Sequence, residues 1–289
     1  MLKIINDKYR IIETIGKSSM SVVYQAVNLE KGDKVAVKQL NSFSTNENRS
    51  EAILRFKREA EVISRLSHPN IIKILDLIEE NANFYIIMEY FAGKDLKSLT
   101  NSLSFTEKIE VMLRCAGALS YIHDNGIIHR DLKPQNILVR QNEKIDIKII
   151  DFGLAYLVDI NDLFKEGTIV GSFSYISPEQ TGLLKRVIDH RADLYSIGAT
   201  FYEMLTGKPP FVESDAGRLI HKHLAKKPEK PSSINNEIPE IIDEIILKLL
   251  NKEPDARYQS AGGLKEDLQY FLDSPDRAKF VIGSKDKND

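Results

Sequence analysis

Alternating apolar and polar positions dominate the N-terminal part of the chain and predict short β-strands separated by turns. Five such runs are recognised, at residues 9–16, 21–29, 33–40, 71–80 and 83–91. Between the third and the fourth, apolar residues recur at helical spacing from Glu51 to Leu66, and "HPN" at 68–70 ends this pattern. We therefore expect a five-stranded antiparallel sheet with one helix.

After "AGKDL" at residues 92–96 the pattern becomes mainly helical. Apolar positions at helical spacing mark residues 95–101, 106–125, 190–206, 215–226 and 238–250. The sequence shows no internal repeat and no long linker. We therefore expect an α+β protein with two lobes: a small one at residues 1–91, a larger and mainly helical one at residues 92–273, and a tail or the start of a linker at residues 274–289.

Composition narrows the class of protein. The formal net charge of −2 gives no bulk attraction to nucleic acid or to an anionic membrane. No apolar run approaches the roughly 20 residues that span a bilayer, and "MLKIINDKYR" lacks the features of a secretory signal. Cys115 is the only cysteine, so no intrachain disulfide can form, and its helical context predicts a small buried apolar group. We expect a cytoplasmic, soluble chain of enzyme size.

Three polar clusters carry candidate chemistry. "VAVK" ends at Lys38, although a lysine that closes an apolar strand is most often a solvated end residue. "IIHRDLKPQNILV" at 127–139 places several polar groups on a loop held by strands at both ends, where catalytic groups are usually found. In "IKIIDFGLA" at 147–155, Asp151 ends a strand twenty residues after Asp131. A hairpin can return one carboxylate beside the other.

Together with "IGKSSMSVVY" at residues 15–24, these motifs resemble those of eukaryotic-type (Hanks-type) serine/threonine protein kinases, in a bacterial version. The resemblance covers about residues 5–272, and the motifs occur in the order of that family. It implies the bilobal protein-kinase fold. It also implies an ATP-dependent phosphotransferase that moves the γ-phosphoryl group of Mg·ATP to serine or threonine hydroxyls of protein substrates in signalling.

The resemblance assigns catalytic roles residue by residue. Lys38 would contact the α- and β-phosphates and pair with Glu59 on the helix. Asp131 would accept a hydrogen bond from the substrate hydroxyl and take its proton, while Lys133 would stabilise the γ-phosphate. Phosphoryl transfer needs this kind of charge neutralisation and positioning more than covalent chemistry.

The same resemblance implies ATP and Mg²⁺ as cofactors. Asn136 and Asp151 would supply hard oxygen ligands to Mg²⁺. Val23, Ala36 and Leu138 would enclose the adenine ring, Met88 would guard the back of its pocket, and backbone groups of Glu89 and Phe91 would bond its edge. The full set assigned to the nucleotide is Ile15, Gly16, Ser18, Val23, Ala36, Lys38, Met88, Glu89, Phe91 and Leu138.

The glycine-rich loop departs from the family pattern. Gly16 is present, but Ser18 and Ser21 stand where two further glycines are usual, which puts the backbone cradle for phosphate in doubt. A non-catalytic, nucleotide-binding scaffold is therefore the alternative to an enzyme. Because the charged residues assigned to catalysis are all present, we expect an active site. A small-molecule kinase is disfavoured by the peptide-docking segment "GSFSYISPEQ" at 171–180.

The resemblance also implies structural roles for several residues. Glu179 of the docking segment should form a buried ion pair with Arg257, and Asp193 should anchor the backbone of the catalytic loop. His129 is interpreted as a packed scaffold histidine and not as an acid–base group.

Two expectations concern regulation and context. Arg130 precedes the catalytic aspartate, so a phosphate on Thr168 would order the activation loop against it, unless Glu166 already supplies the negative charge. The ending "FVIGSKDKND" is interpreted either as a disordered tail or as the exit from a kinase module of a longer chain with further signalling domains.

Overall fold

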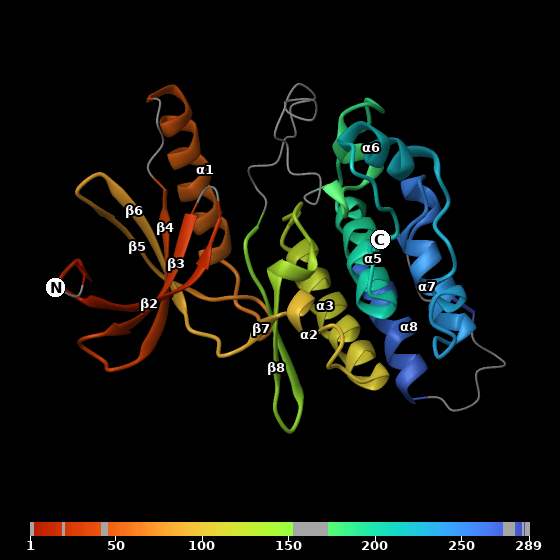
Figure 1. Cartoon of the computed structure of the whole chain (residues 1–289), viewed down its shortest axis with the longest axis horizontal. Coiled ribbons are helices and arrows are strands. Elements are labelled where there is room, and N and C mark those ends of the chain that lie inside the picture. Colours follow the sequence, from red (N-terminus) through yellow and green to blue (C-terminus); the bar gives the residue numbers. More distant parts are fainter. Residues whose placement is uncertain are drawn as a thin grey trace. The chain divides into compact units, whose positions relative to one another are not determined.

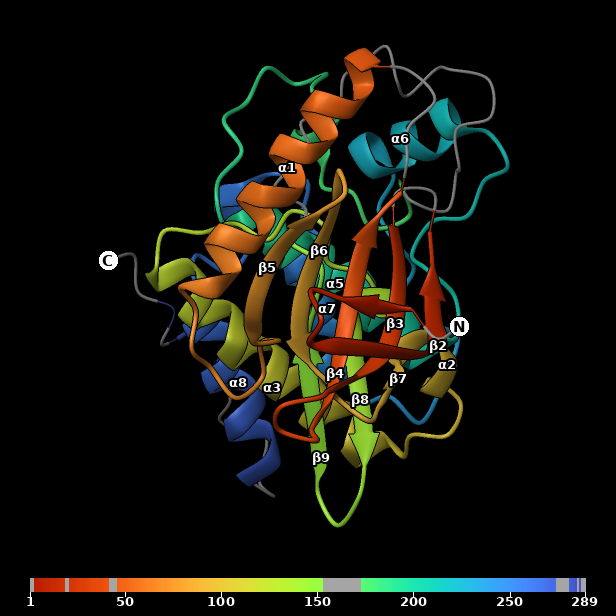
Figure 2. The same ribbon diagram turned by 90° about the vertical axis from the view of Figure 1, so that its left-hand side faces the viewer.

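Six strands form one antiparallel sheet in the N-terminal part of the chain. The computed structural model describes residues 3–18, 21–41, 46–152, 173–273, 281–284 and 286. In spatial order the strands are β1 (Ile4–Ile5), β2 (Tyr9–Lys17), β3 (Ser21–Asn28), β4 (Lys34–Leu40), β6 (Asn83–Glu89) and β5 (Ile74–Glu80). Helix α1 (Asn46–Ser64) lies beside β5 (Figure 2).

The prediction of five strands was wrong by one, because β1 was not expected. This strand has only two residues, Ile4 paired with Arg10 and Ile5 paired with Tyr9. So short a strand cannot show the alternation from which strands are recognised. Ile5 is nonetheless fully buried, and its burial holds the start of the chain on the sheet.

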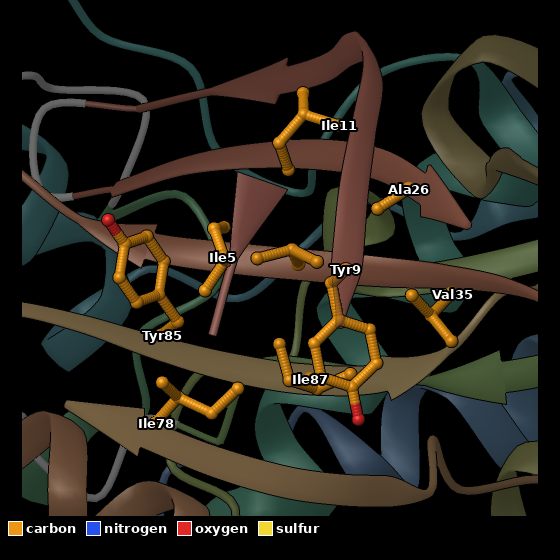
Figure 3. Close-up of a cluster of buried hydrophobic side chains, with 9 residues drawn as sticks. Ile5, Tyr9, Ile11, Ala26, Val35, Ile78, Tyr85 and Ile87 are labelled. Atoms are coloured by element: carbon orange, nitrogen blue, oxygen red, sulfur yellow. The ribbon is translucent and has the colours of Figure 1, made fainter. Parts of the chain in front are cut away.

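The core of this sheet lies on one of its faces (Figure 3). It consists of the buried residues Ile5, Tyr9, Ile11, Ala26, Val35, Val37, Ile78, Tyr85 and Ile87. Successive side chains of a strand point to opposite faces. Since Val35 and Val37 of β4 belong to this core, Ala36 and Lys38 point to the other face of the sheet.

The rest of the chain is mainly helical, as predicted, and contains a second, smaller sheet. Its helices are α2 (Leu96–Leu99), α3 (Phe105–Asp124), α5 (Arg191–Thr206), α6 (Ala216–Ala225), α7 (Glu240–Leu249) and α8 (Ala261–Asp273). Strands β7 (Lys94–Asp95), β8 (Ile137–Gln141) and β9 (Ile145–Ile149) pair in that order. Short 3₁₀ helices are η1 (Pro134–Asn136), η3 (Pro178–Thr181), η4 (Pro231–Ser233) and η5 (Pro254–Ala256).

Helix α5 is the central helix of this part. Every residue from Ala192 to Leu205 is buried, which is typical of a helix surrounded by packed neighbours. Its contacts include α3 and α7, and α3 also packs along α8 (Figure 1). Cys115 of α3 is fully buried, as predicted, and burial raises the pKa of its thiol above the ordinary value.

Two helices begin earlier in the sequence than predicted. Helix α1 begins at Asn46, earlier than expected, because its first turns are polar and show no apolar stripe. The segment "EDLQYFLDS" at 266–274 is interpreted from the sequence as the last helix, but helix α8 begins earlier, at Ala261. Gly262 and Gly263 have low helix propensity and hide its first turn from a sequence pattern.

The chain divides into two compact units, Met1–Ala92 and Gly93–Asp289. Within the ranges that the structure describes, no helix combines the length and the apolar character needed to cross a membrane.

Candidate active site

Strand β4 and helix α1 bring Lys38 and Glu59 together. The Lys38 Nζ lies 2.9 Å from Glu59 Oε1, and the two side chains are only 9% and 16% exposed. An ion pair so withdrawn from water is screened far less than one on the surface. The expected contact is therefore present, and it fixes the ammonium group at the centre of the sheet.

Four of the residues expected at the nucleotide share one face of the sheet. In the strand register Val23 lies opposite Lys38, and Ala36 lies opposite Met88. Residues directly opposite each other point to the same side of a sheet, as do residues two apart on one strand. Val23, Ala36, Lys38 and Met88 thus form one surface, on the side opposite the core of Figure 3.

The remaining expected residues of this unit lie on, or directly after, strands β2 and β6. Gly16 pairs with Val23 in the register, and Ile15 is 47% exposed. Phe91 is buried, whereas the Glu89 N–H donates to the Lys73 carbonyl at 3.0 Å. The Glu89 N–H group is therefore already bonded to the residue directly before β5.

The tip of the β2–β3 hairpin is closed by the two serines that replace glycines. The Ser18 N–H donates to the Ser21 carbonyl at 2.8 Å, and the Ser21 N–H donates to Ser18 Oγ at 3.0 Å. The two hydroxyl oxygens lie 3.2 Å apart. The serines thus bond to each other, a contact that the sequence did not indicate, because spacing alone does not show which way two hydroxyls point.

In the larger unit, Lys133 and Asn136 both bond to the carboxylate of Asp131. Lys133 Nζ donates to Asp131 Oδ2 at 2.7 Å. Asn136 Nδ2 donates to Asp131 Oδ2 at 2.9 Å and to the Asp131 carbonyl at 2.8 Å. Side-chain exposure of 21% leaves both Asp131 and Lys133 partly open to solvent. The arrangement holds one oxygen of Asp131 rigidly at the surface.

The backbone around Asp131 is fixed from α5, as predicted for Asp193. The Asp193 carboxylate accepts from the N–H groups of His129 and Arg130, each at 2.8 Å. Burial raises the pKa of this carboxyl, but the hydrogen bond from His123 and the other polar contacts outweigh it, so its pKa lies below the ordinary value. Asp193 therefore stays ionised and holds the loop in place through these two hydrogen bonds.

A further contact holds this loop and was not expected from the sequence. The Gln180 Nε2 donates to the Arg130 carbonyl at 2.9 Å. Arg130 itself has φ of +68°, a left-handed conformation that costs a non-glycine residue about 1–3 kcal/mol. The Arg130 N–H bonds to Asp193 and its carbonyl accepts from Gln180, and these two hydrogen bonds hold the residue in this conformation.

His129 is a packed scaffold residue, as predicted. It is fully buried, and burial lowers the pKa of its imidazole. Its Nε2 lies 3.2 Å from the Ile150 carbonyl, which can only accept, and its Nδ1 lies 3.3 Å from the Asp131 N–H, which can only donate. Both contacts require neutral imidazole with the proton on Nε2. The ring also stacks on Phe152 at 4.5 Å.

The β8–β9 hairpin returns Asp151 toward the loop. Ile137 lies opposite Ile149, and the Ile150 N–H donates to the Asn136 carbonyl at 2.9 Å. Asp151 follows directly, with φ of +55°. Leu138 lies on β8 and is half-buried. The predicted hairpin is confirmed, and the backbones that carry Asn136 and Asp151 are adjacent.

The described part of the docking segment, residues 173–180, is mostly buried. Arg257 forms the predicted ion pair with Glu179, with contacts of 2.6 and 2.8 Å. Tyr175 donates to Glu203 at 2.5 Å, a contact that the sequence did not indicate. Burial and this hydrogen bond raise the pKa of the Tyr175 hydroxyl. Thr168 and Glu166 lie outside the described residues.

Comparison with known proteins agrees with these motifs. The family model of the protein kinase domain matches residues 9–268. A probable serine/threonine-protein kinase of Clostridium perfringens is 38% identical over 291 residues, which cover 99% of this chain and 41% of the relative. The serine/threonine-protein kinase PrkC of Bacillus subtilis is 35% identical over 277 residues, 94% of this chain and 42% of PrkC.

A solved structure extends the agreement to the fold. The crystal structure of the PknI kinase domain of Mycobacterium tuberculosis gives a TM-score of 0.69 at 26% identity, covering 92% of this chain and 97% of that domain. The chain spans about two fifths of the length of the curated relatives. With the matched region, the order of its motifs and its two-unit architecture, the chain belongs to the protein kinase family.

Proposed function

We propose that this chain is a serine/threonine protein kinase, which transfers the γ-phosphoryl group of Mg·ATP to hydroxyls of protein substrates. The observation that carries the proposal is the Asp131 carboxylate, held by Lys133 and Asn136 on a loop that Asp193 fixes. A partly exposed carboxylate with a fixed oxygen suits a group that receives a proton from a substrate hydroxyl. The family and the serine/threonine kinases among its relatives support the same conclusion.

Asp131 orients the acceptor in this proposal. One of its oxygens bonds to Lys133 and Asn136, so the second can accept a hydrogen bond from the substrate hydroxyl. That bond aims the oxygen at the phosphorus, and the proton moves to Asp131 as transfer completes. Lys133, two residues away, neutralises charge on the transferred group. Positioning and charge are what phosphoryl transfer needs from a protein.

Lys38 would bind the α- and β-phosphates, with Glu59 keeping its ammonium group in place at 2.9 Å. Val23, Ala36 and Met88 share the face of Lys38 and would line the adenine end of the nucleotide site. The hairpin tip would cover the phosphates with Ile15, Gly16 and Ser18.

Asn136 and Asp151 fit the binding of Mg²⁺. Asn136 uses its amide nitrogen on Asp131, which turns its amide oxygen away from that carboxylate. Such an oxygen and the Asp151 carboxylate are the hard ligands that Mg²⁺ takes alongside phosphate oxygens. When bound, the ion would neutralise charge on the phosphates. Asn136 orients Asp131 through its amide nitrogen and serves the ion through its oxygen.

The greater length of the curated relatives supports a second part of the proposal. This kinase unit would act beside further signalling domains of a longer protein, on protein substrates that dock along the segment at residues 171–180.

The test compares Asp131→Asn with Asp146→Asn in the full chain. Asp146 lies on β9, pairs with Arg140 and is 36% exposed, so the same substitution there leaves the loop intact. Transfer of label from γ-labelled ATP to a protein substrate should fall by about 10²- to 10⁴-fold in Asp131→Asn, with ATP affinity unchanged. Asp146→Asn should retain full activity.

The alternative, a nucleotide-binding scaffold, makes a different prediction. Wild-type protein would bind Mg·ATP in calorimetry but transfer no label, and Asp131→Asn would be indistinguishable from it. That result would refute the proposed kinase activity.

A further inference from the structure

Asp286, which follows α8 in the sequence, bonds to the residues directly before the start of that helix. Asp286 Oδ2 accepts from the Gln259 N–H at 2.7 Å, and Asp286 Oδ1 accepts from the Ser260 N–H at 2.9 Å and the Ser260 hydroxyl at 3.1 Å. Ser260 stands directly before the first residue of α8. Backbone N–H groups at a helix start lack partners inside the helix and attract negative charge. Asp286 supplies that charge from a distant point in the chain.

The surface that receives Asp286 is shaped for it. A Cβ added at Gly263 would lie 2.5 Å from Asp286 Oδ1, and the three heavy atoms nearest to it all belong to Asp286. Gly262, the neighbouring glycine, would meet nothing closer than 3.6 Å. Only the absence of a side chain at Gly263 lets the carboxylate approach.

A second point of attachment lies three residues before Asp286. The Gly283 N–H donates to Asp267 Oδ2 at 2.7 Å, and the same oxygen accepts from the Tyr258 hydroxyl at 2.6 Å. Gly283 has φ of +72°, which favours glycine, and a Cβ there would lie 2.0 Å from Lys248 Nζ. Two separate polar contacts therefore hold this stretch against α8 and the residues directly before it.

The backbone bonded to Asp286 lies close in sequence to Arg257, which forms the ion pair with the docking segment. Gln259 follows Arg257 by two residues, and Arg257 holds the buried Glu179 of the segment. Gln259 is itself bonded from the other side, since Arg191 donates to its Oε1 at 2.8 Å and His190 Nε2 lies 2.7 Å from its carbonyl. Asp286 is thus one of the groups that fix the loop bearing Arg257.

We propose that the start of α8 is a carboxylate-binding site whose ligand is the chain's own Asp286. Residues 281–284 and 286, here called the strap, dock there through Asp286 and Gly283 and brace the Arg257 loop, and with it residues 173–180 of the docking segment. The strap makes the stretch after the last helix an integral part of the kinase unit. This inference goes beyond the proposed catalytic function and does not depend on it.

The test is a double-substitution cycle in the full chain, followed by thermal unfolding. Alanine normally stabilises a helix relative to glycine. Gly263→Ala should nevertheless lower Tm in the wild-type background, because its methyl group displaces Asp286. The expected decrease is about 2–4 °C for a chain of roughly this size. In the Asp286→Gly background, where the three nearest atoms are gone, the same substitution should leave Tm unchanged or raise it.

Gly262→Ala is the matched control and should shift Tm equally in both backgrounds. If Gly263→Ala lowers Tm by the same amount with and without Asp286, the site does not bind the strap and the proposal fails.

Amide hydrogen exchange tests the bracing itself. Asp286→Gly should speed exchange at Gln259 and Ser260 and also in residues 173–180, while a control segment in α3 keeps its rate. Faster exchange at Gln259 and Ser260 with an unchanged docking segment would show a strap that braces nothing, which would overturn that part of the proposal.

Discussion

Glu179→Gln should destabilise the larger unit far more than the same substitution at the surface. The side chains of Arg257 and Glu179 are 0% and 1% exposed. All five guanidinium N–H groups are used, two on Glu179 and three on the carbonyls of Asn251, Arg191 and Lys252. The arginine cannot leave this site to find water. Glutamine keeps the volume of Glu179 but removes the charge that compensates the guanidinium.

The expected loss is roughly 3–5 kcal/mol of unfolding free energy, the range for breaking a buried pair by removing one partner. The matched control is Glu253→Gln, which breaks the Arg186–Glu253 pair at 2.8 Å, where the side chains are 36% and 65% exposed. Such a pair contributes at most about 1 kcal/mol. Urea unfolding followed by circular dichroism suits a chain without tryptophan. A loss below about 1 kcal/mol for Glu179→Gln would refute the reasoning.

Three further predictions concern groups in other parts of the fold. Complete burial raises the pKa of the Cys115 thiol, so a thiol reagent at pH 8 should label the folded protein much more slowly than the urea-unfolded protein; equal rates would contradict this. Burial, and then the nearby Lys252 ammonium, lower the pKa of His223 to about 3. The unfolded state therefore binds the extra proton below about pH 6.5, so the unfolding free energy should fall by up to about 1.4 kcal/mol per pH unit from pH 6 to pH 5, and His223→Gln should lose this part of the slope. Glycine at both Ser18 and Ser21 should preserve or tighten ATP affinity in calorimetry; a loss of more than tenfold, about 1.4 kcal/mol, would show that the bonded serines shape the phosphate site.

Much of the loop that bears Asp131, and of the contacts that hold it, was predictable because linear motifs specify them. Asp131, Lys133 and Asn136 lie within six residues, so one turn of loop and 3₁₀ helix must bring them together. The hairpin that returns Asp151 follows from two short apolar strands and the turn between them. Asp193 and Arg257 are distant in sequence, and they were assigned through the family resemblance, not through any periodicity.

Contacts of single polar side chains across long distances were not predictable. Gln180 bonds the Arg130 carbonyl, Tyr175 bonds Glu203, and Asp286 bonds the start of α8. Each depends on the final packing of elements far apart in the chain, and none leaves a repeating pattern in the sequence. Strand β1 was missed for a related reason, since Ile5 is recognisable as a core residue only once the sheet exists.

The identity of the phosphorylated amino acid tests the central claim most directly. Wild-type protein is incubated with γ-labelled Mg·ATP and a protein substrate that carries serine, threonine and tyrosine, and the labelled product is hydrolysed to its amino acids. The account predicts label on phosphoserine or phosphothreonine, with none when Asp131→Asn replaces the wild type. Label on phosphotyrosine alone, or equal labelling by Asp131→Asn, would contradict it.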